Sequence, residues 1–311
     1  MKLPSKTQII SAYVRLKKEG IVSELVDSKN KNLFLKAENT LLGGSYKIRG
    51  VREYFEQIKL SKHVIKVLSA GNLALAAAIE SYKRKLPCQA VVPIGVSEIK
   101  KRKLQEYGAE ILEVPFANLW NLVNTAPDQL EGEYLHPLNS LLLCGYATMA
   151  LEIREQLPTY DALVIPYGLG GLAVSLAHGC AIGNGGRKTK IYIAEISGHS
   201  PLKTSLENGQ PMPSPKLQSF IEALGAPEVL PPVFERIQHY SPEVILVSEK
   251  ETRDGIRELY LDYGLRVEGA AGATYIAAKK VASQKSEKVV TILSGGNISD
   301  DIFKKIVGSN L

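Results

Sequence analysis

Short runs of β-branched and aliphatic residues alternate along the chain with longer segments of helical periodicity. The runs expected to form strands are 33–38, 64–69, 90–94, 110–114, 162–166, 191–195, 244–247 and 289–293. The helical segments are 72–84, 98–107, 146–156, 172–181, 249–263 and 271–282. A strand that leads through a helix to another strand needs a crossover connection, so the strands should pair in parallel, with helices on both faces. The sequence therefore predicts an α/β fold with open, mostly parallel sheets flanked by helices.

The composition restricts the class of protein. With 311 residues, 45% of them hydrophobic, the chain can bury a substantial core in one or two domains. Its net charge of +6 suits an anionic ligand but is too small and too dispersed to predict nucleic-acid binding. Three widely spaced cysteines form neither a metal-binding pair nor a complete disulfide set. Because the sequence also lacks a signal peptide and a membrane-spanning segment, we expect a cytoplasmic protein.

One lysine is expected at the start of a helix. After a strand, Gly43 and Gly44 form a turn, Ser45 can cap the next helix, and Lys47 falls in its first turn. The unpaired N–H groups of a helix N-terminus are positive, which disfavours the ammonium form of a lysine there. The free amine is the nucleophile that condenses with a carbonyl group. The pattern alone also fits an ordinary surface lysine.

Three further segments each follow an expected strand. In Ser69-Ala70-Gly71-Asn72, backbone N–H groups at a helix start can hold a carboxylate, and the Asn72 amide can bond a ring oxygen. The glycine turn from 168 to 171 lets bare backbone approach a phosphate. Ser294 presents a hydroxyl at the carboxyl end of a strand, where ligands of open α/β sheets gather. Each segment alone also fits a routine cap or turn.

In order and approximate spacing, the four segments resemble the fold-type II pyridoxal-phosphate enzymes, which are similar to the β subunit of tryptophan synthase. The closest likeness is to the threonine dehydratase and serine racemase branch, whose lysine motif is Ser-Phe-Lys-(Ile/Leu)-Arg-Gly. The stretch 45–50 reads Ser-Tyr-Lys-Ile-Arg-Gly, whereas cysteine and threonine synthases usually have Lys-Asp-Arg. His136-Pro137 and the stretch 267–273, Val-Glu-Gly-Ala-Ala-Gly-Ala, also match family segments, so the likeness covers most of the chain.

This resemblance implies a role for each matched residue. Lys47 would form the internal aldimine with pyridoxal 5'-phosphate and then remove the α-proton of the substrate. The other residues implied to bind the cofactor are Asn72, Gly168, Leu169, Gly170, Gly171, Leu172 and Ser294. The residues implied to bind the substrate carboxylate are Ser69, Ala70, Gly71 and Leu73. The family also implies two domains, a large one of residues 1–47 and 146–311 and a small one of residues 48–145, and assembly as a homodimer.

The implied function is a pyridoxal-phosphate-dependent ammonia-lyase. It would act on threonine, serine or a related β-substituted amino acid and release a 2-oxo acid and ammonium. The neutral hydroxyl of Ser294 at the pyridine nitrogen does not force its protonation, which favours β-elimination over transamination.

Departures from the family pattern lie around the expected pocket and keep other functions open. Leu73 replaces the usual His, Leu169 interrupts the usual run of glycines, and Tyr146 replaces the Gln of Gly-Gln-Gly-Thr. Ala70 stands where the racemase needs a serine to act on the opposite face of the α-carbon. The alternatives are a β-replacement synthase, an amino-acid racemase and a cofactor-binding protein with little turnover.

The branch also has a divalent-cation site, formed by a Glu after a strand and an Asp six residues further on. Glu195 matches the first ligand, whereas Pro201 occupies the second position and offers no side-chain oxygen. Glu195 is therefore a candidate ligand whose usual partner is missing, and the sequence leaves open whether a divalent cation is bound.

Overall fold

The computed structural model describes residues 1–58, 64–125, 134–183, 188–215, 219–284 and 287–308. Contacts between Cα atoms divide the chain into two compact units. Unit 1 comprises Met1–Ile21 and Lys47–Tyr146, and unit 2 comprises Val22–Tyr46 and Ala147–Leu311. The contacts thus group the first 21 residues with unit 1, whereas the resemblance implied that residues 1–47 belong to the large domain. The domain boundaries stay a prediction.

Unit 1 is built on a four-stranded parallel sheet in the order β5-β4-β3-β6. Its strands are β3 (Ile65–Leu68), β4 (Cys88–Pro93), β5 (Glu110–Val114) and β6 (Tyr134–Leu135). Its helices are α1 (Lys6–Lys18), α2 (Lys47–Gln57), α3 (Asn72–Arg84), α4 (Glu98–Gln105), α5 (Phe116–Asn124) and the first part of α6 (Ser140–Gln156). The sequence did not predict β6 or the helices α1 and α5.

Helix α3 shows how local sequence positions the elements of unit 1. It begins directly after Gly71, runs through buried alanines, and ends where Lys85 adopts a left-handed φ of 55°. The carboxylate of Glu80 on α3 is buried and pairs with Arg52 of α2 at 2.6 Å. Because a buried carboxylate left unpaired would be costly, this ion pair fixes α2, and hence the start of α2 at Lys47, against α3.

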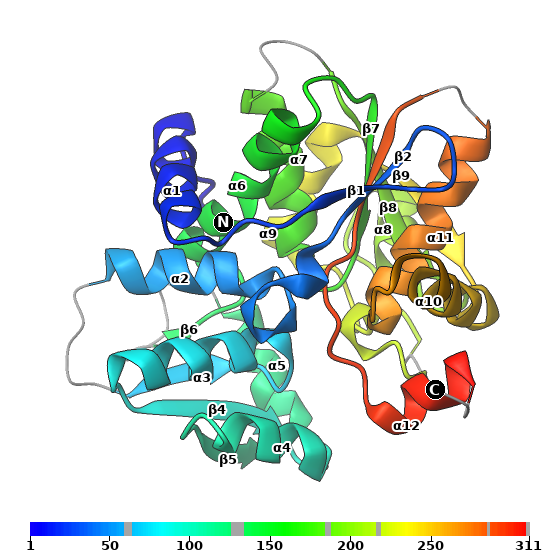
Figure 1. The fold of residues 1–311 in the computed structure, drawn as a ribbon. Helices are drawn as coiled ribbons and strands as arrows, with labels where there is room; N and C mark the ends of the chain where they lie inside the picture. Colours follow the sequence, from blue (N-terminus) through cyan, green and yellow to red (C-terminus); the bar gives the residue numbers. More distant parts are fainter. Residues whose placement is uncertain (59–63, 126–133, 184–187, 216–218, 285–286, 309–311) are drawn as a thin grey trace. The chain divides into compact units, whose positions relative to one another are not determined.

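Unit 2 contains a six-stranded sheet in the order β1-β2-β10-β7-β8-β9, drawn with its helices in Figure 1. Its strands are β1 (Leu25–Asp27), β2 (Leu33–Lys36), β7 (Ala162–Pro166), β8 (Lys190–Ile196), β9 (Glu243–Val247) and β10 (Val289–Ile292). Among the described strands of this sheet, only β1 pairs antiparallel, with β2. The 3₁₀ turns are η1 (Glu38–Thr40), η2 (Leu42–Gly44), η4 (Glu222–Leu224) and η5 (Gln238–Tyr240). Besides the second part of α6, its helices are α7 (Gly171–Gly183), α8 (Pro201–Asn208), α9 (Pro231–Ile237), α10 (Glu249–Tyr263), α11 (Gly269–Gln284) and α12 (Asp300–Val307).

The central strands of unit 2 are buried along their whole length, as parallel strands covered on both faces are. Every residue of β7 and β10 is buried. The core continues into α11, whose small residues, among them Gly272, let it lie close to α10: an added Cβ at Gly272 would be 2.6 Å from Cγ1 of Ile256. The predicted α/β fold with mostly parallel sheets is therefore confirmed.

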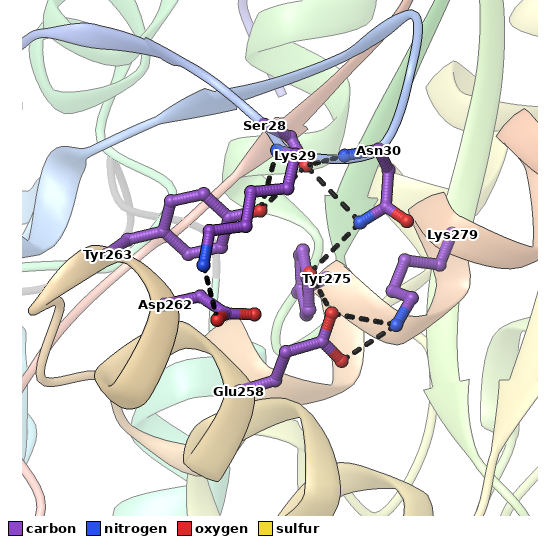
Figure 2. A network of polar contacts seen from close by, with 8 residues as sticks. All are labelled: Ser28, Lys29, Asn30, Glu258, Asp262, Tyr263, Tyr275 and Lys279. Carbon is purple, nitrogen blue, oxygen red and sulfur yellow. Dashed lines mark hydrogen bonds and ion pairs between the residues drawn. The ribbon is translucent and has the colours of Figure 1, made fainter.

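A polar network holds the β1–β2 hairpin of unit 2 against α10 and α11 (Figure 2). The eight residues drawn are Ser28, Lys29, Asn30, Glu258, Asp262, Tyr263, Tyr275 and Lys279. Asn30 donates to the hydroxyl of Tyr275 at 3.3 Å, and Tyr275 donates to Glu258 at 2.6 Å. Burial, followed by the hydrogen bond to Glu258, raises the pKa of the Tyr275 phenol. The network anchors a short edge hairpin whose second strand, β2, leads into the segment before Lys47.

A buried ion pair fixes the end of β2 itself. The fully buried Lys36 ammonium group lies 2.5 Å from Glu152 on α6 and donates to the carbonyl of Ser23 at 2.7 Å and to Gln156 at 2.8 Å. Glu152 also accepts from the backbone N–H of Ser23. Because these groups satisfy one another, the end of β2 is held in one defined position before η1.

Candidate active site

Lys47 is the first residue of α2, as the sequence predicted. The preceding turn η2 holds Gly43 at a φ of 75° and Gly44 at 69°, in the left-handed region that favours glycine. Ser45 then returns to extended backbone and is buried, while Lys47 is only half-buried. The Gly-Gly turn therefore places a half-buried lysine at a helix start.

The loop that carries Lys47 is bonded to the loop that follows β10. The N–H of Tyr46 donates to the carbonyl of Ser294 at 3.2 Å, and the side chain of Asn297 donates to the carbonyl of Gly43 at 2.7 Å. An added Cβ at Gly44 would lie 3.1 Å from the Asn297 side chain, so this approach favours glycine. Two sequence-predicted segments, about 250 residues apart, are thus joined directly before Lys47.

Tyr46 packs into unit 2 instead of presenting its hydroxyl for chemistry. Its side chain is 9% exposed, and burial, followed by the nearby carboxylates of Glu268 and Glu38, raises the pKa of its phenol. The phenol therefore stays protonated at neutral pH. Ser294 is 3% exposed and lies two residues after the end of the buried strand β10.

The glycine turn after β7 needs glycine at two positions because of its neighbours. Gly170 has a φ of 83°, and a Cβ there would lie 2.4 Å from Cγ1 of Val233 on α9. A Cβ at Gly168 would lie 2.5 Å from the carbonyl oxygen of Ala223. Leu169 is not among the residues with positive φ, so it interrupts the glycines without that strain. The turn leads straight into α7, whose first N–H groups can hold an anion.

The turn after β3 is open at its glycine. Nothing lies within 4 Å of a Cβ placed on Gly71, and the Gly71 N–H donates to the hydroxyl of Ser69 at 3.1 Å. Asn72 begins α3 and, like Ala70, is half-buried. The side chain of Leu73 is 3% exposed, so this residue can offer a ligand its backbone but not its side chain.

Glu195 on β8 caps a helix. Its Oε1 accepts from the N–H of Leu202 and its Oε2 from the N–H of Lys203, both at 2.9 Å. Burial raises the pKa of Glu195 to about 7, against the opposing effect of these two hydrogen bonds. In the described part of the chain, no group of three His, Cys, Asp or Glu residues is arranged to hold a metal ion. With both oxygens engaged by α8 and Pro201 beside them, these residues do not fit the cation site of the family.

A contact that the sequence did not predict joins Lys47 to Tyr146. The Nζ of Lys47 lies 5.2 Å from the centroid of the Tyr146 ring, within the range of a cation–π interaction. The same ring explains why residue 50 is a glycine, because a Cβ there would lie 2.4 Å from Cε1 of Tyr146. The sequence signal that could have indicated this contact was the presence of a glycine one turn after the lysine, together with an aromatic residue at position 146.

Comparison with known proteins defines the class to which this site belongs. The family of pyridoxal-phosphate dependent enzymes matches residues 17–295, so the chain belongs to this family. It is 25% identical over 297 residues to an L-threonine ammonia-lyase of Thermotoga maritima, covering 94% of this chain and 73% of the relative. It is 27% identical over 296 residues to a serine dehydratase-like protein of Mus musculus, covering 88% of each. The solved structure of maize serine racemase superposes with a TM-score of 0.84 at 23% identity, covering 98% of this chain and 97% of that one.

Each unit, taken by itself, has residues whose chemistry suits one part of pyridoxal phosphate. Unit 1 supplies an amine at a helix start and an open glycine turn before Asn72. Unit 2 supplies a glycine turn in which neighbouring atoms leave no room for a side chain at Gly168 or Gly170. It also supplies a buried serine after β10. The first feature suits the aldehyde, the glycine turn suits a phosphate, and a neutral hydroxyl suits a pyridine nitrogen.

Proposed function

We propose that the protein is a pyridoxal-phosphate-dependent ammonia-lyase. It eliminates the β-substituent of threonine, serine or a related amino acid and yields a 2-oxo acid and ammonium. The observation that carries this proposal is the hydrogen bond from the N–H of Tyr46 to the carbonyl of Ser294, because it joins the residue before Lys47 to the loop that bears a neutral hydroxyl. The named activities of the ammonia-lyase and dehydratase relatives support the same reaction class.

Each group of residues has a separate task in the proposed reaction. Bound pyridoxal phosphate supplies an electron sink that acidifies the α C–H of an attached amino acid. Lys47 holds the cofactor and, once released, its Nζ accepts the α-proton as general base. The N–H groups of the turn 168–171 and of Leu172 bind the phosphate. The side chain of Asn72 bonds the ring hydroxyl, and the backbone of 69–73 binds the substrate carboxylate.

Elimination is favoured over racemisation by the residue at position 70. A racemase needs an acid on the face of the α-carbon opposite the lysine, and Ala70 has no hydroxyl to supply it. Ser294 would offer a neutral hydroxyl, and not an acid, to the pyridine nitrogen of the cofactor, which would favour expulsion of the β-substituent over transamination. Loss of water or of another leaving group is then the outcome.

A panel of β-substituted amino acids tests this function. The purified protein with pyridoxal phosphate is expected to release 2-oxo acid and ammonium in equal amounts from threonine or serine without a second substrate. Product that appears only with an added nucleophile would indicate a β-replacement synthase. Formation of the D-amino acid without ammonium would indicate a racemase. A change in the cofactor spectrum without any product would indicate a binding protein, and each of these results would replace the proposal.

The assembly and location of the enzyme are also part of the proposal. We infer a cytoplasmic homodimer with a large domain of residues 1–47 and 146–311 and a small domain of residues 48–145. All three cysteines are free and buried, which is consistent with a reducing compartment. No helix within the described ranges has both the length and the apolar character that a membrane crossing requires. Light scattering coupled to size-exclusion chromatography would measure the mass in solution and so test the dimer.

A further inference from the structure

Tyr146 lies beneath the amine on which the proposed function depends. The Nζ of Lys47 is 5.2 Å from the centroid of the ring, and the ring is fully buried. It sits in the middle of α6 and fills the space above Gly50 of α2, where even a Cβ would lie 2.4 Å from Cε1. Packing between α2 and α6 thus holds the ring in one place, and Lys47 is held one helical turn from Gly50.

We propose that Tyr146 is a positioning residue whose ring face holds the ammonium form of Lys47 in place until the cofactor aldehyde arrives. The face of an aromatic ring is negative and attracts a cation at this distance. The attraction is lost when the amine is neutral, so the ring opposes the helix N-terminus, which favours the neutral form. Tyr146 thereby sets the direction of the Lys47 side chain. It also sets the fraction of Lys47 that is the neutral, reactive amine. This inference rests on the proposed role of Lys47 as the cofactor lysine.

The contact belongs to this chain and not to the pattern of its branch. The branch has Gly-Gln-Gly-Thr where this chain has Gly145-Tyr146-Ala147-Thr148. A glutamine amide has no aromatic face, so it cannot hold a lysine in this way. Tyr at position 146 therefore differs from Gln in chemistry as well as in size, because it places an aromatic ring face against the Nζ of Lys47.

A spectroscopic measurement tests the contact without any catalysis. The full-length protein, with cofactor removed, is reductively methylated with ¹³C-formaldehyde, and a Lys47→Met variant identifies the Lys47 signal by its absence. A group held over a ring face is shielded by the ring current. We expect the Lys47 methyl signal to lie upfield of the other lysines in the wild type and in Tyr146→Phe, which keeps the ring, and to return to the ordinary position in Tyr146→Leu.

The rate of labelling gives a second, independent readout. Because only the neutral amine reacts, we expect Lys47 of Tyr146→Leu to be methylated about five-fold faster at neutral pH than Lys47 of Tyr146→Phe, with the other lysines as internal reference. An unshifted Lys47 signal in the wild type, or a shift lost in the Phe variant, would overturn the proposal. If thermal unfolding shows that the Leu variant does not fold, the wild-type and Phe signals decide it alone. Neither readout requires 2-oxo acid release, so a wrong substrate class would leave this test intact.

Discussion

Two helices of unit 2 begin close to the ends of neighbouring strands, yet their N-termini are used in opposite ways. Helix α7 follows β7 through a glycine turn that has no room for side chains at 168 and 170. Helix α8 follows β8 and has two of its first N–H groups bonded to the buried carboxylate of Glu195. A helix N-terminus attracts negative charge in either case. Under the proposed function, the N-terminus of α7 receives an anion from outside the chain, whereas that of α8 is occupied by a carboxylate of the preceding strand.

The comparison predicts the largest effect for a side chain placed in the glycine turn. Gly170→Ala combines a left-handed φ with a Cβ 2.4 Å from Val233, and we expect it to lower the free energy of unfolding by ~2–4 kcal/mol. It should also weaken cofactor binding, measured by absorbance titration, because the N–H groups of the turn shift.

Gly209, the residue that ends α8, provides the matched control. Its φ is 71°, but nothing lies within 4 Å of an added Cβ. Gly209→Ala should therefore cost only ~1 kcal/mol of left-handed strain and leave cofactor affinity unchanged. Equal losses in the two variants, measured by urea unfolding, would contradict the tight fit assigned to the turn before α7.

A smaller effect on stability is expected at the N-terminus of α8, which is capped by Glu195. The pKa of Glu195 is about 7 in the folded state, above the value of ~4.3 for an unfolded glutamate, so the folded state binds its proton more tightly. The associated stability is complete below pH ~4.3 and is lost as the pH rises through about 7. The Gln side chain of Glu195→Gln does not titrate, so the variant lacks this loss. Between pH 5 and 8, the free energy of unfolding of the variant should therefore rise by ~1–3 kcal/mol relative to that of the wild type.

Urea titrations of both proteins across this pH range measure that difference. A constant difference between wild type and Glu195→Gln would mean that the carboxylate keeps its ordinary acidity when it caps α8.

The smallest expected effect concerns divalent cations. Since both oxygens of Glu195 accept backbone N–H groups, Mg²⁺, Ca²⁺ or a chelator should shift the thermal midpoint of the wild type by less than about 1 °C. Differential scanning fluorimetry measures this directly. A clear stabilisation by either cation that Glu195→Gln abolishes would show that the carboxylate leaves α8 to bind metal.

Much of the architecture could be predicted because it depends on local signals. The bounds of α3 and α10 agree with the sequence-based expectation, since Gly71 and the Ser248 capping box mark their starts. Strands β1 and β6 were missed because they contain only three and two residues, too few to show a period. Helix α12 was missed although its two turns are amphipathic, because it is short and follows an irregular segment.

The candidate site could be predicted only as far as its motifs. The sequence indicated the lysine at a helix start and the serine after a strand, and the structure adds that Tyr46 and Ser294 are bonded. The contact of Lys47 with Tyr146 depends on how two helices pack, which no local pattern specifies. The bonding of Glu195 to α8 depends in the same way on the direction of the turn after β8.

The central claim is that the amine of Lys47 is the one that binds pyridoxal phosphate. Reduction of the cofactor-loaded protein with borohydride, followed by proteolysis and mass spectrometry, identifies the lysine that carries the label. The account predicts a single labelled peptide that contains Lys47, and no visible band of lysine-bound cofactor in Lys47→Ala. Label on a different lysine, or an unchanged band in the Ala variant, would contradict it.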